Sequence, residues 1–300
     1  MVLLSSYLEQ YLIEQQEERN HPLSIHTLDA YRVDIRQFSD WQEEKGLSLP
    51  DVTFAHLKEY RQGMEEKYSI SSIDRKTATI NKLLKHLHDT GKNALSRQIP
   101  RVKHQDQSFL PDMLSNLDFE RTLRQIRKAG DLQTEAAAML IYYTGARASE
   151  LVQLKIKDIE SETVRILGKG SKYRELFLPK ILRPYLRAWA TESGKQGEEY
   201  LFSPRGEPDS PQTRSRLFAR LKYYAGQARI AKAKMSPHAL RHLYTKNLSE
   251  IGVNYAAIRQ LLGHSAKDTT DIYLSLGKKE LLSLINKIGT PEDRAKERNR

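Results

Sequence analysis

The sequence predicts a mainly α-helical protein of two domains, in which the second domain adds one small antiparallel β-sheet to its helices. Three observations predict this class. Apolar residues recur at three- and four-residue steps through much of the chain, a polar stretch with prolines interrupts that pattern at residues 99–111, and one strand–turn–strand pattern occurs at residues 164–178. A chain of 300 residues is long enough for two domains that each bury a core.

The first predicted domain, residues 1–98, is helical. One helix follows the capping residue Ser24 and carries a single apolar face. That face consists of Leu28, Tyr31, Ile35, Phe38 and Trp41. A second helix, residues 72–89, has apolar residues on one face and basic residues elsewhere, and Gly91 ends it. Acidic side chains concentrate in residues 1–66, so we expect this domain to have an acidic and a basic side.

Residues 99–111 are interpreted as a linker, and residues 112–290 as the second domain. Its hairpin turns at Gly168–Ser171, and Asp158–Ile159 is a candidate third strand. Ser236 and Pro237 begin a later helix, because serine caps free amides and proline fits the first turn. The charged segment 291–300 is expected to be disordered.

The net charge of +11, from 49 Lys and Arg against 38 Asp and Glu, indicates a polyanionic partner. Composition alone is equally compatible with a basic, solvated surface that binds nothing. The chain contains no cysteine, which excludes disulfide frameworks and cysteine-based zinc sites. No segment is apolar for long enough to span a bilayer, so we expect a cytoplasmic protein without membrane contact.

Candidate residues for phosphate chemistry occur in order along the second domain. They are Arg147 after a tight turn, Lys169 at the hairpin tip, His238 and Arg241 on one helix, His264 at a helix end, and Tyr273 nine residues later. The segments Thr144–Leu151, Gly168–Gly170, His238–His242 and Leu262–His264, followed by Tyr273, resemble the motifs of the tyrosine recombinases, the phage integrase family. The resemblance is strongest to the compact Xer-like members and extends over the whole chain.

The resemblance implies that Arg147 and Arg241 bind the scissile phosphate of DNA. A phosphodiester is anionic and gains further charge in the transition state, so preorganised cations lower the barrier. Arginine stays charged and donates to two oxygens in a fixed plane. With arginines in this role, neither a metal nor a cofactor is expected.

The resemblance also assigns the proton and bond chemistry. Tyr273 is the implied nucleophile, which forms a phosphotyrosyl ester that stores the energy of the broken bond. Lys169 is the implied general acid toward the departing 5′ hydroxyl. His238 is implied as proton acceptor or phosphate ligand, and His264 as a hydrogen-bond donor to the phosphate.

Taken singly, each of these residues has a structural interpretation. Tyr273 can pack in a core, His264 can cap a helix, His238 can be a first-turn residue, and Arg147 and Lys169 can be solvated cations. The presence of all six in order, each with a fitting strand, turn or helix, favours the joint interpretation.

No catalytic role is assigned to the residues next to these motif positions. Glu150 is expected to support the local helix and the arginine, and His242 can simply pack. Leu274–Ser275 and Tyr244 depart from the pattern common among Xer relatives, which weakens an assignment to the housekeeping chromosome-dimer pair.

The resemblance implies that residues 1–98 form a core-binding, SAM-like domain and residues 112–290 the catalytic domain. The expected partner is double-stranded DNA with an inverted-repeat core site, bound by a homotetramer or a heterotetramer. Basic residues expected to contact DNA are Arg75, Lys76, Lys82 and Lys85. The apolar helix with Leu281, Leu282 and Ile285 docks either on a neighbouring subunit or on its own domain.

The predicted function is site-specific recombination through a 3′-phosphotyrosyl intermediate and a Holliday junction, in resolution of dimers or transposon cointegrates. Three alternatives remain: an integrase or excisionase of a mobile element, a non-catalytic DNA-binding regulator, and a type IB topoisomerase. A separate arm-binding domain is not expected, because the chain starts with the core-binding region.

Overall fold

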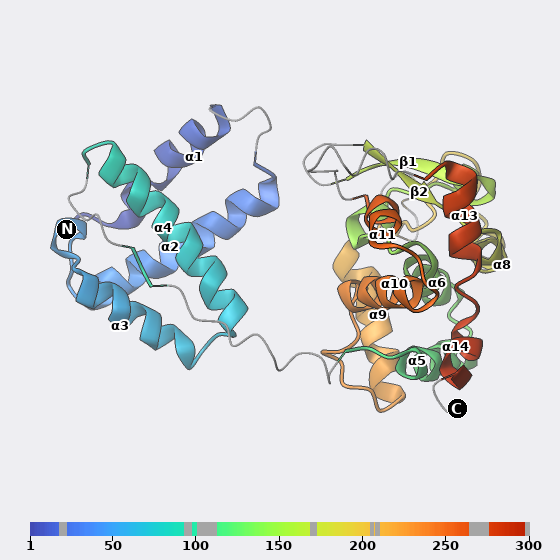
Figure 1. Ribbon diagram of the computed structural model, residues 1–300. Coiled ribbons are helices and arrows are strands. Elements are labelled where there is room, and N and C mark those ends of the chain that lie inside the picture. Colours follow the sequence, from blue (N-terminus) through green and yellow to red (C-terminus); the bar gives the residue numbers. More distant parts are fainter. Residues whose placement is uncertain are drawn as a thin grey trace. The chain divides into compact units, whose positions relative to one another are not determined.

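The computed structural model describes residues 1–17, 23–92, 98–100, 113–168, 173–204, 207, 211–263 and 276–297. The chain divides into two compact units, Met1–Ser108 and Phe109–Arg300. Figure 1 shows helices in both units and a β-hairpin in the second, which agrees with the predicted fold class.

The first unit is built from helices. They are η1 (Leu4–Tyr7), α1 (Leu8–Glu17), α2 (Ile25–Glu44), η2 (Leu49–Asp51), α3 (Phe54–Glu65) and α4 (Ile70–Asp89). The predicted cap of α2 is confirmed, since the hydroxyl of Ser24 accepts a hydrogen bond from the backbone N–H of Thr27. The apolar face of α2 enters the core, where Phe38 is fully buried with its ring centroid 4.8 Å from that of Tyr60. This core therefore follows the helical spacing of apolar residues.

Ile99 belongs to the core of the first unit, which corrects the predicted linker boundary at 98/99. Its side chain is 2% exposed. The side chain of Asn81 on α4 accepts from Ile99 N at 2.7 Å and donates to Ile99 O at 3.0 Å. The amide of Asn81 satisfies both backbone groups of Ile99, so α4 fixes the chain beyond residue 98.

The second unit surrounds one buried helix, α6. Its elements are α5 (Asn116–Lys128), α6 (Leu132–Thr144), α7 (Ala148–Leu151), η4 (Ile156–Glu160), β1 (Thr163–Leu167), β2 (Tyr173–Phe177), η5 (Lys180–Leu182), α8 (Arg183–Ser193), α9 (Arg214–Gln227), α10 (Pro237–Glu250), α11 (Tyr255–Leu261), α13 (Lys278–Asn286) and α14 (Pro291–Glu297). After its first turn, helix α6 is apolar on all sides, and the helix contacts α5, α8, α9 and α10 (Figure 1). No described helix has the length and apolar character of a membrane span.

The predicted hairpin is confirmed, but the candidate third strand is wrong. Strands β1 and β2 pair antiparallel, with Val164 opposite Leu176 and Leu167 opposite Tyr173. Residues 156–160, which include Asp158, form the 3-10 helix η4 instead of a strand. The Asp158 carboxylate accepts from Lys155 N at 2.8 Å, and this local cap stabilises a helical turn in place of a strand.

The expected disorder of residues 291–300 is wrong for residues 291–297, which form α14 against α5 (Figure 1). Ala295 is buried, and the guanidinium of Arg294 donates to the Glu250 carboxylate at 2.7 Å. Acidic residues in the first turn of α14 and basic residues in the last also suit the helix dipole. Residues 298–300 lie outside the described residues.

The apolar tail helix α13 packs on its own unit. Leu281, Ile285 and Ile288 are each 1% exposed and belong to the main core of the second unit. Of the two docking sites that the sequence left open, the single chain uses the one on its own domain.

We expect Ile285→Ala to lower the free energy of unfolding of the isolated chain by about 2–5 kcal/mol, because truncation leaves a cavity in a packed core. Urea unfolding of the DNA-free protein measures this value. Lys279→Ala, at an exposed position of the same helix, is the control and should change stability little. Equal, small effects of both variants would show that α13 does not dock in the monomer.

Candidate active site

Three of the six predicted catalytic residues lie in the described part of the chain: Arg147, His238 and Arg241. Lys169, in the segment 169–172, and His264 and Tyr273, in the segment 264–275, lie outside the described residues, so their placement stays a prediction.

Arg147 is held where the buried helix α6 ends. Gly145 closes α6 with a φ of +59°, in the left-handed region that favours glycine. A Cβ on Gly145 would lie 2.5 Å from Cδ1 of Tyr244, whose side chain is fully buried. Conformation and space therefore both require glycine here. The chain then turns into α7, and Arg147 is the N-cap residue of that short helix.

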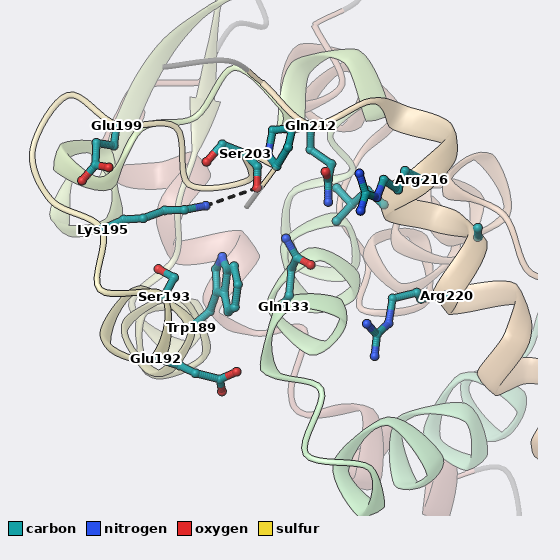
Figure 2. A pocket seen from close by; sticks show the side chains of 13 residues that line it. Gln133, Trp189, Glu192, Ser193, Lys195, Glu199, Ser203, Gln212, Arg216 and Arg220 are labelled. Atoms are coloured by element: carbon teal, nitrogen blue, oxygen red, sulfur yellow. Dashed lines mark hydrogen bonds between the residues drawn. The ribbon is translucent and has the colours of Figure 1, made fainter. Parts of the chain in front are cut away.

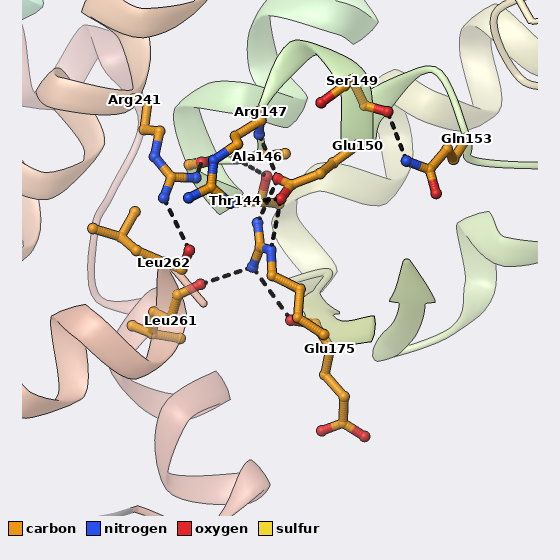
Figure 3. A network of polar contacts seen from close by, with 12 residues as sticks. Thr144, Ala146, Arg147, Ser149, Glu150, Gln153, Glu175, Arg241, Leu261 and Leu262 are labelled. Atoms are coloured by element: carbon orange, nitrogen blue, oxygen red, sulfur yellow. Dashed lines mark hydrogen bonds and ion pairs between the residues drawn. The ribbon is translucent and has the colours of Figure 1, made fainter. Parts of the chain in front are cut away.

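Glu150 is fully buried and gathers two arginines around its carboxylate (Figure 3). It accepts from Arg147 N at 2.6 Å and Arg147 Nη1 at 2.8 Å. It also accepts from Arg174 Nε at 3.0 Å and Arg174 Nη2 at 2.7 Å. Burial alone raises the pKa of this carboxyl, but the hydrogen bonds and charge of the two arginines outweigh it and lower the pKa to about 2. The expected support of Arg147 by Glu150 is confirmed.

Arg241 is buried beside Arg147 (Figure 3), with 8% of the residue exposed. Its Nη1 donates to Gly145 O at 2.5 Å and its Nη2 to Leu262 O at 2.9 Å. Burial, reinforced by the charges of Arg147 and Arg174, lowers the pKa of Arg241 to about 10, so it stays protonated at neutral pH. Among the described residues, three guanidiniums thus lie around one carboxylate.

His238 and His242 form a hydrogen-bonded pair on α10, with their Nε2 atoms 2.9 Å apart. Ser236 caps this helix as predicted, because its hydroxyl accepts from Ala239 N at 3.1 Å. One ring must donate and the other accept, so the pair shares a single hydrogen at this contact. Burial and the charges of His238 and Arg241 lower the pKa of His242. His242 therefore does more than pack: it fixes the exposed ring of His238.

Arg174 in β2 is a site residue that the motifs do not indicate. Its side chain is 9% exposed, and besides Glu150 it donates from Nη1 to Leu261 O at 3.1 Å. Because side chains alternate along a strand, Arg174 shares a face with the buried Leu176. An arginine on the core face of a strand was the available signal in the sequence.

The basic residues predicted to contact DNA from the first unit have different surroundings. Lys76 is 4% exposed, and its Nζ contacts the Asp34 carboxylate at 3.3 Å and the Gln37 amide oxygen at 2.5 Å. Its predicted DNA contact is therefore wrong, because the ammonium is buried and paired within the unit. Arg75 makes a bidentate pair with Asp34 but is half exposed.

Lys82 and Lys85 are exposed on α4. The ammonium of Lys82 donates to the hydroxyl of Tyr31 at 2.8 Å. An ammonium has three donors, so this contact leaves Lys82 able to bind another acceptor.

A cavity of about 860 Å³ lies apart from the arginine cluster, among α6, α8, α9 and the loop after α8 (Figure 2). Lys195 donates to Leu201 O at 3.4 Å and Ser203 O at 3.5 Å, and Trp189 Nε1 donates to Leu201 O at 2.8 Å. Burial lowers the pKa of Lys195. These polar groups hold the backbone of the loop, so the cavity is the space beneath that loop.

The chain belongs to the phage integrase family. The model of that family matches residues 113–280, which is more than half of the chain. The model described as the N-terminal SAM-like domain of phage integrases matches residues 8–91. The resemblance inferred from the motifs is therefore confirmed.

Its relatives include tyrosine recombinases named XerD. That of Vibrio cholerae is 30% identical over 290 residues, which cover 93% of this chain and 94% of the relative. That of Haemophilus influenzae is 27% identical and covers 95% of this chain and 96% of the relative.

Solved structures share the fold. The post-cleavage complex of the XerH site-specific recombinase with palindromic difH substrate aligns with a TM-score of 0.66 and 22% identity, covering 93% of this chain and 83% of that one. A lambda integrase dimer bound to a COC′ core site aligns with a TM-score of 0.63 and 18% identity, covering 87% of this chain and 94% of that one.

We expect Glu150→Gln to destabilise the protein by about 3 kcal/mol at pH 7, because each pKa unit corresponds to about 1.4 kcal/mol. The folded state lowers this pKa from 4.5 to about 2. The stabilisation is therefore complete above pH 4.5 and is lost as the pH falls toward 2. Urea unfolding at pH 7 and at pH 3 should show the gap between wild type and variant shrinking in acid.

The exposed carboxyl of Glu160, whose pKa is lowered by its hydrogen bond to Arg187, supplies the control. Glu160→Gln should change stability little, because solvent screens exposed ion pairs. A gap for Glu150→Gln that stays constant with pH would refute the assigned role of the carboxylate charge.

Proposed function

We propose that this protein is a site-specific DNA recombinase that cuts and rejoins strands through a covalent bond to Tyr273. The observation that supports it most is the fixed placement of two arginines: Arg147 is held by the Glu150 carboxylate and Arg241 by the Gly145 carbonyl. Two fixed guanidiniums suit a phosphodiester, whose transition state gathers negative charge on its oxygens.

In the proposed reaction, the phenolic oxygen of Tyr273 attacks the phosphorus while Arg147 and Arg241 bind the non-bridging oxygens. The new O–P bond replaces the bond to the 5′ oxygen, which leaves as a hydroxyl after receiving a proton from Lys169. The phenol proton passes to His238 or to water, and His264 donates to the phosphate. Reversal of these steps by another 5′ hydroxyl rejoins the strand without ATP, since the 3′-phosphotyrosyl ester keeps the bond energy.

We propose that this reaction needs no metal ion, because the arginines supply the charge that a metal would otherwise provide. The buried position of Arg241 supports this role, since an electrostatic contact is stronger where water is excluded. A pKa of about 10 keeps Arg241 positive throughout the neutral range.

We propose that the biological role is resolution of dimers or of transposon cointegrates, by a tetramer that passes through a Holliday junction. The resemblance to the compact Xer-like members supports this choice, and relatives named XerD match at up to 31% identity over most of the chain. Solved structures of integrases align with this chain equally well, at 16–18% identity. This structural similarity therefore supports the fold and does not distinguish between the two roles.

We expect Tyr273→Phe to abolish a covalent protein–DNA adduct on a nicked core-site substrate, because phenylalanine lacks the attacking oxygen. DNA affinity in a gel-shift assay should stay within about twofold of wild type, since one hydroxyl adds little to a phosphate-dominated interface. Denaturing gels report the adduct. Tyr255→Phe, an exposed tyrosine of α11, is the matched control and should form the adduct normally.

Persistence of the adduct in Tyr273→Phe would reject the nucleophile. Its absence from the wild type on every core site tried would favour a non-catalytic DNA-binding protein.

We propose that the first unit binds the duplex through α4, with Lys82, Lys85 and the half-exposed Arg75. Exposed ammonium groups can neutralise phosphates and release counterions. Lys76 is left out of this set because it is buried.

We expect Lys82→Gln combined with Lys85→Gln to weaken DNA binding at every sequence and to flatten its salt dependence. Each lost phosphate contact should reduce the slope of log K against log salt by about 0.9. Binding measured between 50 and 200 mM salt tests this. Lys45→Gln, at an exposed lysine paired with Glu59 on the same unit, is the control. An unchanged slope in the double variant would remove α4 from the interface.

A further inference from the structure

Arg174 makes more contacts to the segments of the candidate active site than any role in the hairpin requires. It lies in β2, on the strand that follows the hairpin tip, five residues after Lys169. Its guanidinium binds both oxygens of Glu150 in the α7 segment, and its Nη1 reaches Leu261 O at the end of α11. One side chain thus joins a strand, a turn and a helix end.

The end of α11, the third of these segments, lies close against the aliphatic part of the Arg174 side chain. Gly263 has a φ of +66°, and a Cβ on it would lie only 2.1 Å from Cδ of Arg174. The carbonyls of Leu261 and Leu262 accept from Arg174 and Arg241 respectively (Figure 3). Two guanidiniums therefore hold successive carbonyls just ahead of residue 264.

We propose that Arg174 is a positioning residue that sets the relative placement of strand β2, of the turn that bears Arg147 and of the end of α11. This inference rests on the proposed recombinase function. Arg174 acts on Arg147 through the Glu150 carboxylate, and on the end of α11 through Leu261 O and Gly263.

The geometry requires arginine at this position. Its contacts with Glu150 are bidentate, while the remaining nitrogen donates to Leu261 O. Lysine offers one nitrogen on a flexible stem, so it can replace the charge but not three directed hydrogen bonds. Arg174→Lys therefore keeps the positive charge but loses the directed hydrogen bonds, so it distinguishes the effect of the charge from that of positioning.

We expect Arg174→Lys to slow single-turnover cleavage of a nicked core-site substrate by about 100-fold at saturating protein, the scale of loss that a misplacement of about 1 Å produces. DNA affinity should stay within about threefold of wild type. Arg187→Lys is the control, since Arg187 makes a similar bidentate pair with the exposed Glu160. It should cleave at the wild-type rate.

A pH profile separates positioning from a general loss of stability. In the part of the chain that the structure describes, Arg147, Arg174 and Arg241 are the charged groups that face Glu150, from its own turn, from β2 and from α10. Removal of Arg174 takes away one of the charges that keep Glu150 ionised. Arg174→Gln should therefore show cleavage falling on acidification at a higher pH than in the wild type, as Glu150 gains a proton and releases Arg147. Arg174→Gln with Glu150→Gln should lose that fall in cleavage.

Gly263→Ala tests the same positioning role without changing Arg174 itself. It should reproduce the slow cleavage, because the methyl group displaces the stem of Arg174. Gly252→Ala is matched to it: Gly252 has a φ of +79° and nothing within 4 Å of the added Cβ. Both variants therefore carry the strain of an alanine at positive φ, and they differ only in the contact with Arg174.

Wild-type cleavage by Arg174→Lys, or equal rates for Gly263→Ala and Gly252→Ala, would overturn the inference while leaving the recombinase proposal standing. Absence of any adduct from the wild type would instead reject the proposed function. If Arg174→Lys unfolds, as judged by circular dichroism, the two glycine variants and the pH profile decide the matter.

Discussion

The candidate active site depends on one buried carboxylate, that of Glu150. A carboxylate without solvent is unstable unless donors surround it, and here Arg147 and Arg174 supply four hydrogen bonds. The dependence is mutual, because guanidiniums brought this close repel one another unless a negative charge lies among them. Glu150 offsets only part of that repulsion. The remaining positive charge is what an incoming phosphate would neutralise.

The rest of the second unit keeps this cluster rigid. Helix α6 is buried on every side and ends at Gly145, whose left-handed conformation and contact with Tyr244 fix the start of the turn that bears Arg147. The carbonyl of Gly145 then receives the guanidinium of Arg241 from α10. Charged groups fixed in advance by packed helices need little reorganisation when charge develops on a substrate, which is the physical basis of electrostatic catalysis.

The two units hold their basic side chains in different surroundings. On α4, exposed lysines remain available to solvent, while Lys76 is used internally to neutralise Asp34. In the second unit Arg174 and Arg241 are largely buried, and Arg147 is partly exposed beside them. The tail helix α13 completes the core of its own unit in the single chain. If it docks on a neighbour in an assembly, the exchange must first expose Leu281, Ile285 and Ile288, which couples assembly to the cost of opening that core.

The sequence by itself determined the class of fold, the hairpin, the helix caps at Ser24 and Ser236, and the family, because periodicity, turn chemistry and motif order are local properties of the chain. Only the tertiary structure decided that Lys76 is buried, that residues 291–297 are helical, that α13 packs on its own unit, and that Arg174 reaches Glu150 and Leu261. These depend on which distant segments meet. A basic residue has the same sequence signal in solvent as in a buried ion pair, and a short charged helix such as α14 is stable only against the partner that covers it.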